Sequence, residues 1–278
     1  MNKPIKNEVI RQVNLVPNFI TAFSLACGLF VIFKAVHTHN LVTPYQLMHA
    51  AMILLIIGAI ADFLDGAIAR AIKAESEFGF TFDTLSDAVT FAVAPSVMAL
   101  KIASGIEPEG QWFFFSLASC MIFSICGVLR LVRFNVISNK NKGNTQEEFA
   151  LKKNFIGLPT PASALTFASL VLFLTSSYAE AITDKMKLSL IICFALLLGY
   201  LMVSRSKFPS LKSLHVKVPT FDLIFVSVVI AVVILYGILY YLPVVLFAIM
   251  ISYVLFGVLL NVVRFFLARK LKRHTEKK

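Results

Sequence analysis

The chain has 278 residues, of which 58% are hydrophobic and only 15% are charged, and its mean hydropathy is +0.83. So few charges cannot cover a soluble protein of this size, because soluble domains are about 45–50% apolar. The net charge of +11 would ordinarily indicate nucleic-acid binding, but no basic stretch is interleaved with aromatic residues in a polar segment. The composition therefore predicts a polytopic membrane protein and excludes a soluble or nucleic-acid-binding one.

The first apolar stretch is preceded by an amphipathic segment, Ile5–Val16. Ile5, Val9 and Val13 recur every fourth residue there, and the charged residues fall largely on other faces of the helical wheel. This pattern favours an interfacial helix on the membrane surface, within a cytoplasmic segment over residues 1–18. A disordered basic tail is the alternative. No small-residue cleavage site marks a removable signal peptide.

Eight apolar stretches of about 20 residues follow, the length that crosses a bilayer core of ~30 Å. They are Phe19–Val36, Leu47–Gly66, Thr81–Leu100, Trp112–Leu131, Leu158–Thr175, Leu188–Val203, Leu223–Tyr241 and Val244–Phe266. We expect an all-α membrane helix bundle, with a membrane core over residues 19–205. A C-terminal transmembrane hairpin over 206–267 and a basic cytoplasmic tail over 268–278 complete the predicted organisation.

Lysine and arginine residues predict the orientation of the bundle. With four exceptions, they lie in segments that the eight spans place on one side of the membrane. The exceptions are Lys34, Lys101, Lys185 and Lys187. Cytoplasmic loops carry an excess of these residues, so both termini are expected in the cytoplasm, as an even number of spans requires.

Two pairs of aspartates occur where the second predicted span ends and the third begins: Asp62 and Asp65, then Asp83 and Asp87. A carboxylate in hydrocarbon costs several kcal/mol, so four of them need a compensating charge. The opposite directions of the two spans bring the four to a similar depth. Asp83 and Asp87 are expected in the first two turns of their helix. Spacings of three and four place each pair on one helix face, and two such faces suit two Mg²⁺ or Mn²⁺ ions.

The residues around these acids fit a bound phosphate. Gly66 and Gly79 carry no side chain and allow a ligand or another backbone to approach closely. Two cations could hold a diphosphate between them, and Arg70 could contact a phosphate with its planar fork. In the alternative interpretation, the acids merely pair with Arg70 and Lys73 at a helix boundary. Four acids at this spacing, together with two glycines, favour the metal site.

The same residues carry a resemblance to a known family. The pattern D-x2-D-G-x2-A-R-x8-G-x3-D-x3-D is the signature of the CDP-alcohol phosphotransferases, and every specified position matches. These positions are Asp62, Asp65, Gly66, Ala69, Arg70, Gly79, Asp83 and Asp87. The chain resembles this family over roughly residues 16–203.

The resemblance implies a six-helix core, usually a homodimer, in which an alcohol displaces CMP from a CDP-linked donor. It implies that the four aspartates hold two divalent metals and that Asp87 is the candidate general base. The element Pro17-Asn18-Phe19-Ile20-Thr21 is similar to one that the family places near cytidine. The implied CDP-binding residues are Asn18, Thr21, Asp62, Gly66, Ala69, Arg70 and Gly79.

Three further stretches, 82–95, 129–135 and 157–161, are most similar to members that use CDP-diacylglycerol and L-serine. Arg130, Arg133 and Asn135, in the second of these stretches, are expected near the depth of the acids. An arginine there could bind the lipid phosphate or the serine carboxylate. The alternative is that they are ordinary basic residues flanking a span.

Three other functions remain open at this level. The acceptor could instead be glycerol 3-phosphate, an inositol phosphate or choline, since Lys73 and the lysines of the polar loop at 138–154 could bind a phosphorylated acceptor. A secondary transporter is a second alternative, although transport sites usually lie near the bilayer midplane in repeated halves. A membrane scaffold is a third, and it leaves the four acids unexplained.

Overall fold

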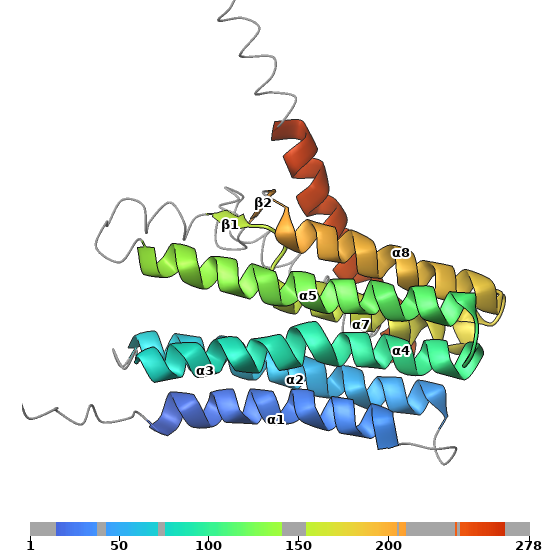
Figure 1. Ribbon diagram of the computed structural model, residues 1–278, viewed down its shortest axis with the longest axis horizontal. Coiled ribbons are helices and arrows are strands. Elements are labelled where there is room, and N and C mark those ends of the chain that lie inside the picture. The colour runs from blue at the N-terminus through green and yellow to red at the C-terminus, as the bar shows by residue number, and fades with distance from the viewer. Residues whose placement is uncertain are drawn as a thin grey trace, which may run out of the picture.

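The computed structural model describes residues 15–37, 43–71, 76–140, 154–204, 206–209, 237 and 240–264. The predicted interfacial helix, Ile5–Val16, and the predicted seventh span, Leu223–Tyr241, lie almost wholly outside these residues, and the basic tail lies entirely outside them. The described residues form a bundle of long helices (Figure 1).

The helices of the bundle agree with most of the predicted spans. They are α1 (Leu15–His37), α2 (Pro44–Ala71), α3 (Glu77–Asp87), α4 (Ala94–Ile106), α5 (Gln111–Lys140), α7 (Thr160–Leu174), α8 (Asp184–Val203) and an unlabelled C-terminal helix, Tyr240–Arg264. Among the described residues, six helical segments are long and apolar enough to cross a membrane. The fifth predicted span corresponds to α7, which has only 15 residues. The all-α membrane bundle is confirmed, and the count of eight spans is not.

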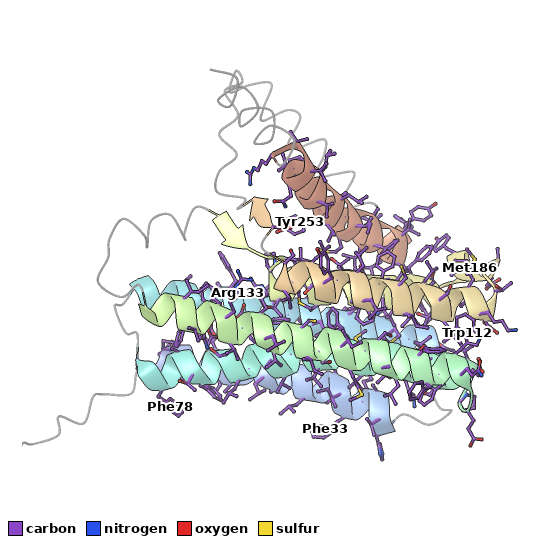
Figure 2. All side chains as sticks on the ribbon, turned by 45° about the horizontal axis from the view of Figure 1, so that its top comes forward. Phe33, Phe78, Trp112, Arg133, Met186 and Tyr253 are labelled. Atoms are coloured by element: carbon purple, nitrogen blue, oxygen red, sulfur yellow. The ribbon has the colours of Figure 1, made fainter. Side chains whose placement is uncertain are left out.

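Consecutive long helices of the chain run in opposite directions along the bundle (Figure 1). The end of α2, the start of α3 and the end of α5 therefore lie at one end of the bundle, which we call the aspartate end. The opposite end, where α5 and α8 begin, is called the far end. Figure 2 marks these two ends by Phe78 and by Trp112 with Met186. The C-terminal helix leans away from the bundle axis.

The exterior of the bundle is apolar, and small residues bring its helices together. Large side chains such as Phe19 and Phe33 are 75% and 65% exposed, as expected of a surface that faces lipid. Inside, Gly28 of α1 lies against the continuation of α3: a Cβ added there would lie 2.5 Å from Thr90 Oγ1. Gly127 meets Ala92 in the same way. Such close contacts are a principal source of packing energy between helices in lipid.

One π-helix, Ala88–Val93, joins α3 to α4, so the predicted span Thr81–Leu100 is one rod with an interrupted hydrogen-bond pattern. The N–H of Ala94 bonds to Val89 O, five residues back. Pro95 follows directly, and a proline inside a helix lacks the N–H that would continue the α pattern. The π-helix was not predicted from the sequence, although Pro95 is a signal for it.

A short antiparallel ribbon was also not predicted. It pairs β1 (Asn154–Ile156) with β2 (Lys207–Pro209) beside the end of α8 (Figure 1). Gly157 follows β1 with φ +82°, a conformation that favours glycine, and its N–H donates to Ser206 O at 2.8 Å. Strands of three residues are too short to show a period of two in a sequence.

Candidate active site

Three of the four predicted aspartates converge at the aspartate end. One carboxylate oxygen from each of Asp62, Asp83 and Asp87 lies within 4.8 Å of the others, and we call these three residues the aspartate cluster. Asp62 comes from α2, and the other two come from successive turns of α3. The two helices run in opposite directions and both pack on α1, and this arrangement brings the three carboxylates together, as the spacing predicted.

The cluster lies deeper than expected. Because α3 begins at Glu77, Asp83 and Asp87 lie in its second and third turns rather than its first two. Asp62 precedes the end of α2 by nine residues, and Asp87 follows the start of α3 by ten. At 1.5 Å per residue both are about 14–15 Å from the helix ends. The prediction that Asp83 and Asp87 lie in the first two turns of their helix was therefore wrong by about one turn.

The chemistry of the cluster fits a divalent cation. The Asp62 side chain is within hydrogen-bonding reach of both Asp83 and Asp87. One oxygen of Asp87, Oδ1, is buried and has no hydrogen-bond partner. Three carboxylates this close repel one another when ionised, and a cation of charge two removes that repulsion. Mg²⁺ and Mn²⁺ prefer such oxygen ligands.

The fourth aspartate, Asp65, has a different environment. Its side chain is 3% exposed, and its Oδ2 accepts a hydrogen bond of 2.6 Å from Thr21 Oγ1 on α1. It is still close enough to Asp87 for the two to interact electrostatically. The structure thus connects Thr21, a predicted CDP-binding residue, to Asp65, a predicted metal ligand, and places this pair beside the cluster.

Helix α1 is fixed against α2, α3 and the π-helix by four hydroxyl side chains, which we call the hydroxyl ladder: Thr21, Ser24, Ser86 and Thr90. Ser86 donates to Thr21 O at 3.3 Å, and Thr90 donates to Ser24 O at 3.2 Å. Ser24 donates to Gly58 O at 3.1 Å. Hydrogen bonds between helices in lipid are worth about 0.6–2 kcal/mol each. The ladder fixes the three helices that carry the predicted site.

The predicted CDP-binding residues lie around the cluster as far as the structure describes them. Asn18 approaches the start of α3, where a Cβ added to Gly79 would lie 3.0 Å from Asn18 Oδ1 and 3.0 Å from Ser76 Oγ. Gly79 therefore leaves room for that contact. Gly66 and Ala69 are half-buried on α2. The side chain of Arg70 and the whole of Lys73 lie outside the described part of the chain, so their predicted roles stay predictions.

Arg130 of α5 points into the same region. Its Nη1 donates to Thr160 Oγ1 at the start of α7, and its Nε is buried without a hydrogen-bond partner. The guanidinium also interacts electrostatically with Asp87. Arg130 lies ten residues before the end of α5, about 15 Å along the helix, which is the depth of the cluster.

The other two residues predicted with Arg130 have structural contacts. Arg133 Nη1 donates to Val203 O at 3.1 Å and so links α5 to the end of α8. Asn135 Nδ2 donates to Thr84 Oγ1 at 2.9 Å, between the two aspartates of α3. These contacts hold α5 beside the cluster. Thr84 and Thr160 were not predicted as site residues, although both lie within the stretches that carried the resemblance.

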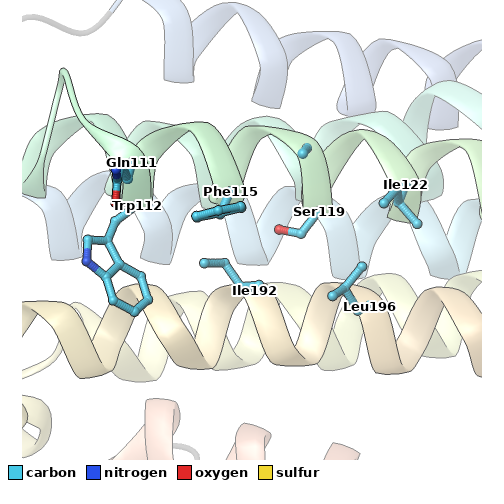
Figure 3. A pocket seen from close by; sticks show the side chains of 8 residues that line it. Gln111, Trp112, Phe115, Ser119, Ile122, Ile192 and Leu196 are labelled. Atoms are coloured by element: carbon cyan, nitrogen blue, oxygen red, sulfur yellow. The ribbon is translucent and has the colours of Figure 1, made fainter.

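The far end has an apolar groove between α5 and α8, of about 460 Å³ (Figure 3). Trp112, Phe115, Ile122, Ile192 and Leu196 supply most of its lining. The side chains that line the groove include no carboxylate and no basic group, so it offers nothing for phosphate or metal chemistry. Its lining suits hydrocarbon, and we do not assign it to the active site.

Comparison with known proteins agrees with this geometry. Residues 14–205 match the CDP-alcohol phosphatidyltransferase family, and the chain belongs to that family. It is similar to the CDP-diacylglycerol–serine O-phosphatidyltransferase of Helicobacter pylori (strain ATCC 700392 / 26695), at 35% identity over 225 residues, covering 79% of this chain and 83% of the relative. The protein of that name in Bacillus subtilis (strain 168) is 34% identical over 200 residues, covering 72% and 93%.

A more distant relative of the same name comes from Methanocaldococcus jannaschii and is 29% identical over 200 residues, covering 72% of this chain and 76% of the relative. The predicted resemblance to the family is therefore confirmed, and the transporter and scaffold alternatives lose their support. The matched region ends before the C-terminal helix begins.

Proposed function

We propose that this chain is an integral-membrane enzyme that transfers the phosphatidyl group of CDP-diacylglycerol to L-serine, giving phosphatidylserine and CMP. The convergence of Asp62, Asp83 and Asp87 carries the proposal, because it supplies a cation site within a bundle of the matching family. The similar proteins of H. pylori and B. subtilis support serine as the acceptor.

In this proposal Asp62, Asp83 and Asp87, with Asp65 beside them, hold two Mg²⁺ or Mn²⁺ ions. Such ions, when bound, neutralise the pyrophosphate of the donor and the charge that develops on the departing CMP. Asn18, Thr21, Gly66, Ala69, Arg70 and Gly79 surround the CDP group. Small residues among these let the nucleotide approach the backbone, and Arg70 pairs with a phosphate.

Asp87 acts as the general base. Its Oδ1, buried and without a hydrogen-bond partner, takes the proton of the serine hydroxyl. The serine oxygen forms a bond to the phosphorus on the diacylglycerol side as the bond from that phosphorus to the CMP oxygen breaks. Arg130 orients an anionic group of a substrate, either the lipid phosphate or the serine carboxylate.

We further propose that the aspartate end faces the cytoplasm in the cell membrane, as the distribution of lysine and arginine favours. Serine then enters from the cytosol and the donor lipid from the membrane plane. The enzyme is proposed to act as a homodimer, as the family resemblance implies, and cross-linking in the membrane would test this.

One assay tests the reaction. Purified protein in detergent with CDP-diacylglycerol, Mn²⁺ and radiolabelled serine should form radiolabelled phosphatidylserine and release an equal amount of CMP. EDTA should abolish the reaction, and added Mn²⁺ or Mg²⁺ should restore it. Release of CMP with glycerol 3-phosphate, an inositol phosphate or choline, but not with serine, would show that this other alcohol is the acceptor. No release of CMP with any of them would reject the proposed function.

A further inference from the structure

A buried threonine at the start of α7 holds the arginine of the proposed site. Arg130 Nη1 donates to Thr160 Oγ1 at 2.5 Å, and the side chain of Thr160 is fully buried. Among the described residues, Thr160 is the only hydrogen-bond partner of this guanidinium, whose Nε is buried without one. A single hydroxyl group therefore provides the polar contact that holds this side chain.

Contacts on either side of Arg130 place it at the level of the proposed base. Towards the far end, Gly127 of α5 lies against the π-helix, where an added Cβ would be 2.7 Å from the nearest side chain. Towards the aspartate end, Asn135 of α5 donates to Thr84 Oγ1 of α3 at 2.9 Å. Between these two contacts, Arg130 lies level with the junction of α3 and the π-helix, and Asp87 is the last residue of α3.

Buried polar atoms without a hydrogen-bond partner occur on both sides of this junction, and they include Asp87 Oδ1 and Arg130 Nε. An unpaired buried donor or acceptor destabilises a protein, so one that is retained needs an explanation such as a catalytic role. One of these atoms can accept a proton, and the other can donate to an anion. The proposed transfer needs both, and the donor is useful only if it points at the substrate.

The hydroxyl group of Thr160 determines that direction. A guanidinium is a rigid plane with five N–H donors in fixed directions. The aliphatic part of the side chain fixes the plane at one corner, and the bond from Nη1 to Thr160 fixes it at another. With two points fixed, the directions of the remaining donors follow. Without the hydroxyl group, rotation about the last bonds of the arginine side chain would change those directions.

Thr160 itself is firmly supported by the chain around it. Pro159 and Pro161 flank it, and each proline ring restricts the backbone torsion φ to a narrow range. The N–H of Leu158, a fully buried residue, donates to Leu201 O near the end of α8 at 3.1 Å. The start of α7 is thus attached to α8 immediately before the threonine.

Side chains add two more bonds between the same elements. Arg133 Nη1 of α5 donates to Val203 O at the end of α8 at 3.1 Å (Figure 2). Ser163 Oγ of α7 donates to Met202 Sδ of α8 at 2.9 Å. The end of α5, the start of α7 and the end of α8 therefore hold one another in place, and Thr160 cannot shift without disturbing these bonds.

We infer that Thr160 is a positioning residue: its hydroxyl group fixes the guanidinium of Arg130 in the orientation that binds an oxyanion of the substrate. The inference rests on the proposed function and adds to it a residue that acts through another. The oxyanion is a phosphate of the donor lipid or the carboxylate of serine. The two sources share one chemistry, and the test separates them.

Kinetics of Thr160→Val, which removes the hydroxyl group and keeps the branched shape, test the inference. The KM of one substrate should rise about five- to tenfold, and kcat should stay within about twofold of the unchanged protein. A rise in the KM of CDP-diacylglycerol identifies the lipid phosphate, and a rise in the KM of serine identifies the carboxylate. Thr160→Ser keeps the hydroxyl group and should restore both KM values to within about twofold.

The matched control is Thr166→Val on the same helix. Thr166 is equally buried, but its hydroxyl group donates to Ala162 O of its own helix, so neither kcat nor either KM should change. Should Thr160→Val not fold, Thr160→Ala takes its place with the same expected result. The inference is overturned if the variant without the hydroxyl group matches the control, if Thr160→Ser is equally impaired, or if kcat falls while both KM values stay constant.

A double substitution tests whether Thr160 acts through Arg130. Arg130→Met keeps much of the length of the side chain and removes every donor. In that background Thr160→Val should change the same KM by less than about twofold, because the group that it positions is gone. A larger further rise would overturn the inference. If the unchanged protein transfers nothing to serine, the proposed function fails instead, and the two failures are thereby distinguished.

Discussion

The two ends of the bundle use the same helices for different purposes. At the aspartate end, α2, α3 and α5 contribute three converging carboxylates and a partly buried arginine. At the far end, α5 and α8 contribute an apolar groove, and Lys187 and Asp184 form a surface ion pair at 3.6 Å. The difference teaches that, among the described residues, side chains suited to metal and phosphate chemistry gather at one end of the bundle. The other end needs little more than apolar side chains that contact lipid and one another.

The largest effect is expected from Asp87→Asn, which keeps the size of the side chain and removes the proposed base. Release of CMP should fall by about 10²–10⁴-fold, the usual contribution of general base catalysis. Asp184→Asn, at the far end, is the control and should leave release unchanged. Near-normal release by Asp87→Asn would remove that residue from the role.

A smaller effect is expected from Thr21→Val, which deletes the hydroxyl that bonds to Asp65 and keeps the branched shape. We expect a loss of about tenfold in kcat/KM, because the buried carboxylate of Asp65 then loses the hydrogen bond from Thr21, at a cost of about 1–3 kcal/mol. Thr21→Ser retains the hydroxyl and should stay within about threefold. Equal losses in both variants would show that shape rather than the hydrogen bond matters.

Stability should respond to the contact between α1 and the π-helix. In Gly28→Ala the new Cβ would lie 2.7 Å from Thr90 Cα, a backbone atom that cannot move alone. We expect the free energy of unfolding to fall by about 1–3 kcal/mol, measured by thermal or denaturant unfolding in detergent. Gly105→Ala, where no atom lies within 4 Å, should be neutral or stabilise by up to about 1 kcal/mol. Similar losses in the two variants would contradict the packing argument.

The smallest effect is expected at the far groove. Ile192→Ala only enlarges the apolar groove between α5 and α8. We therefore expect kcat and both KM values to stay within about twofold of those of the unchanged protein. The same assay of CMP release measures this. A loss as large as that of Thr21→Val would show that the far end takes part in catalysis and would remove the contrast between the two ends.

Much of the site was predictable because its spacing is local. Spacings of three and four residues keep side chains on one helix face, so Asp62, Asp83 and Asp87 could be assigned to a shared site from their positions in the chain. The sequence could not show that Asp65 would bond to Thr21 instead, because that contact depends on the packing of α1 beside α2. Long-range packing of this kind has no periodic signature.

For the fold, too, local patterns could be predicted from the sequence, and contacts between distant segments could not. The apolar stretches indicated the helices, but most of the predicted spans were too short: α5 continues to Lys140, well beyond the predicted Leu131. The fifth span was predicted too long, since α7 covers only Thr160–Leu174. Polar residues such as Arg130 and Asn135 interrupt the apolar window, yet contacts to α7 and α3 keep that part of the helix in the bundle.

The π-helix that directly follows Asp87 has a consequence for how this segment can change. A π turn contains one residue more than an α turn, and one residue corresponds to about 100° of rotation around the axis. The π turn accommodates its extra residue within one full turn, so deleting a single residue between 88 and 93 would restore an α turn and leave the two halves of the rod close to their present orientation. A deletion within the α turns of α4 would instead rotate the two halves by roughly 100°, so that the aspartates of α3 and the packing face of α4 could no longer both keep their present contacts. The π-helix is therefore the place in this rod where the loss of one residue should be tolerated best.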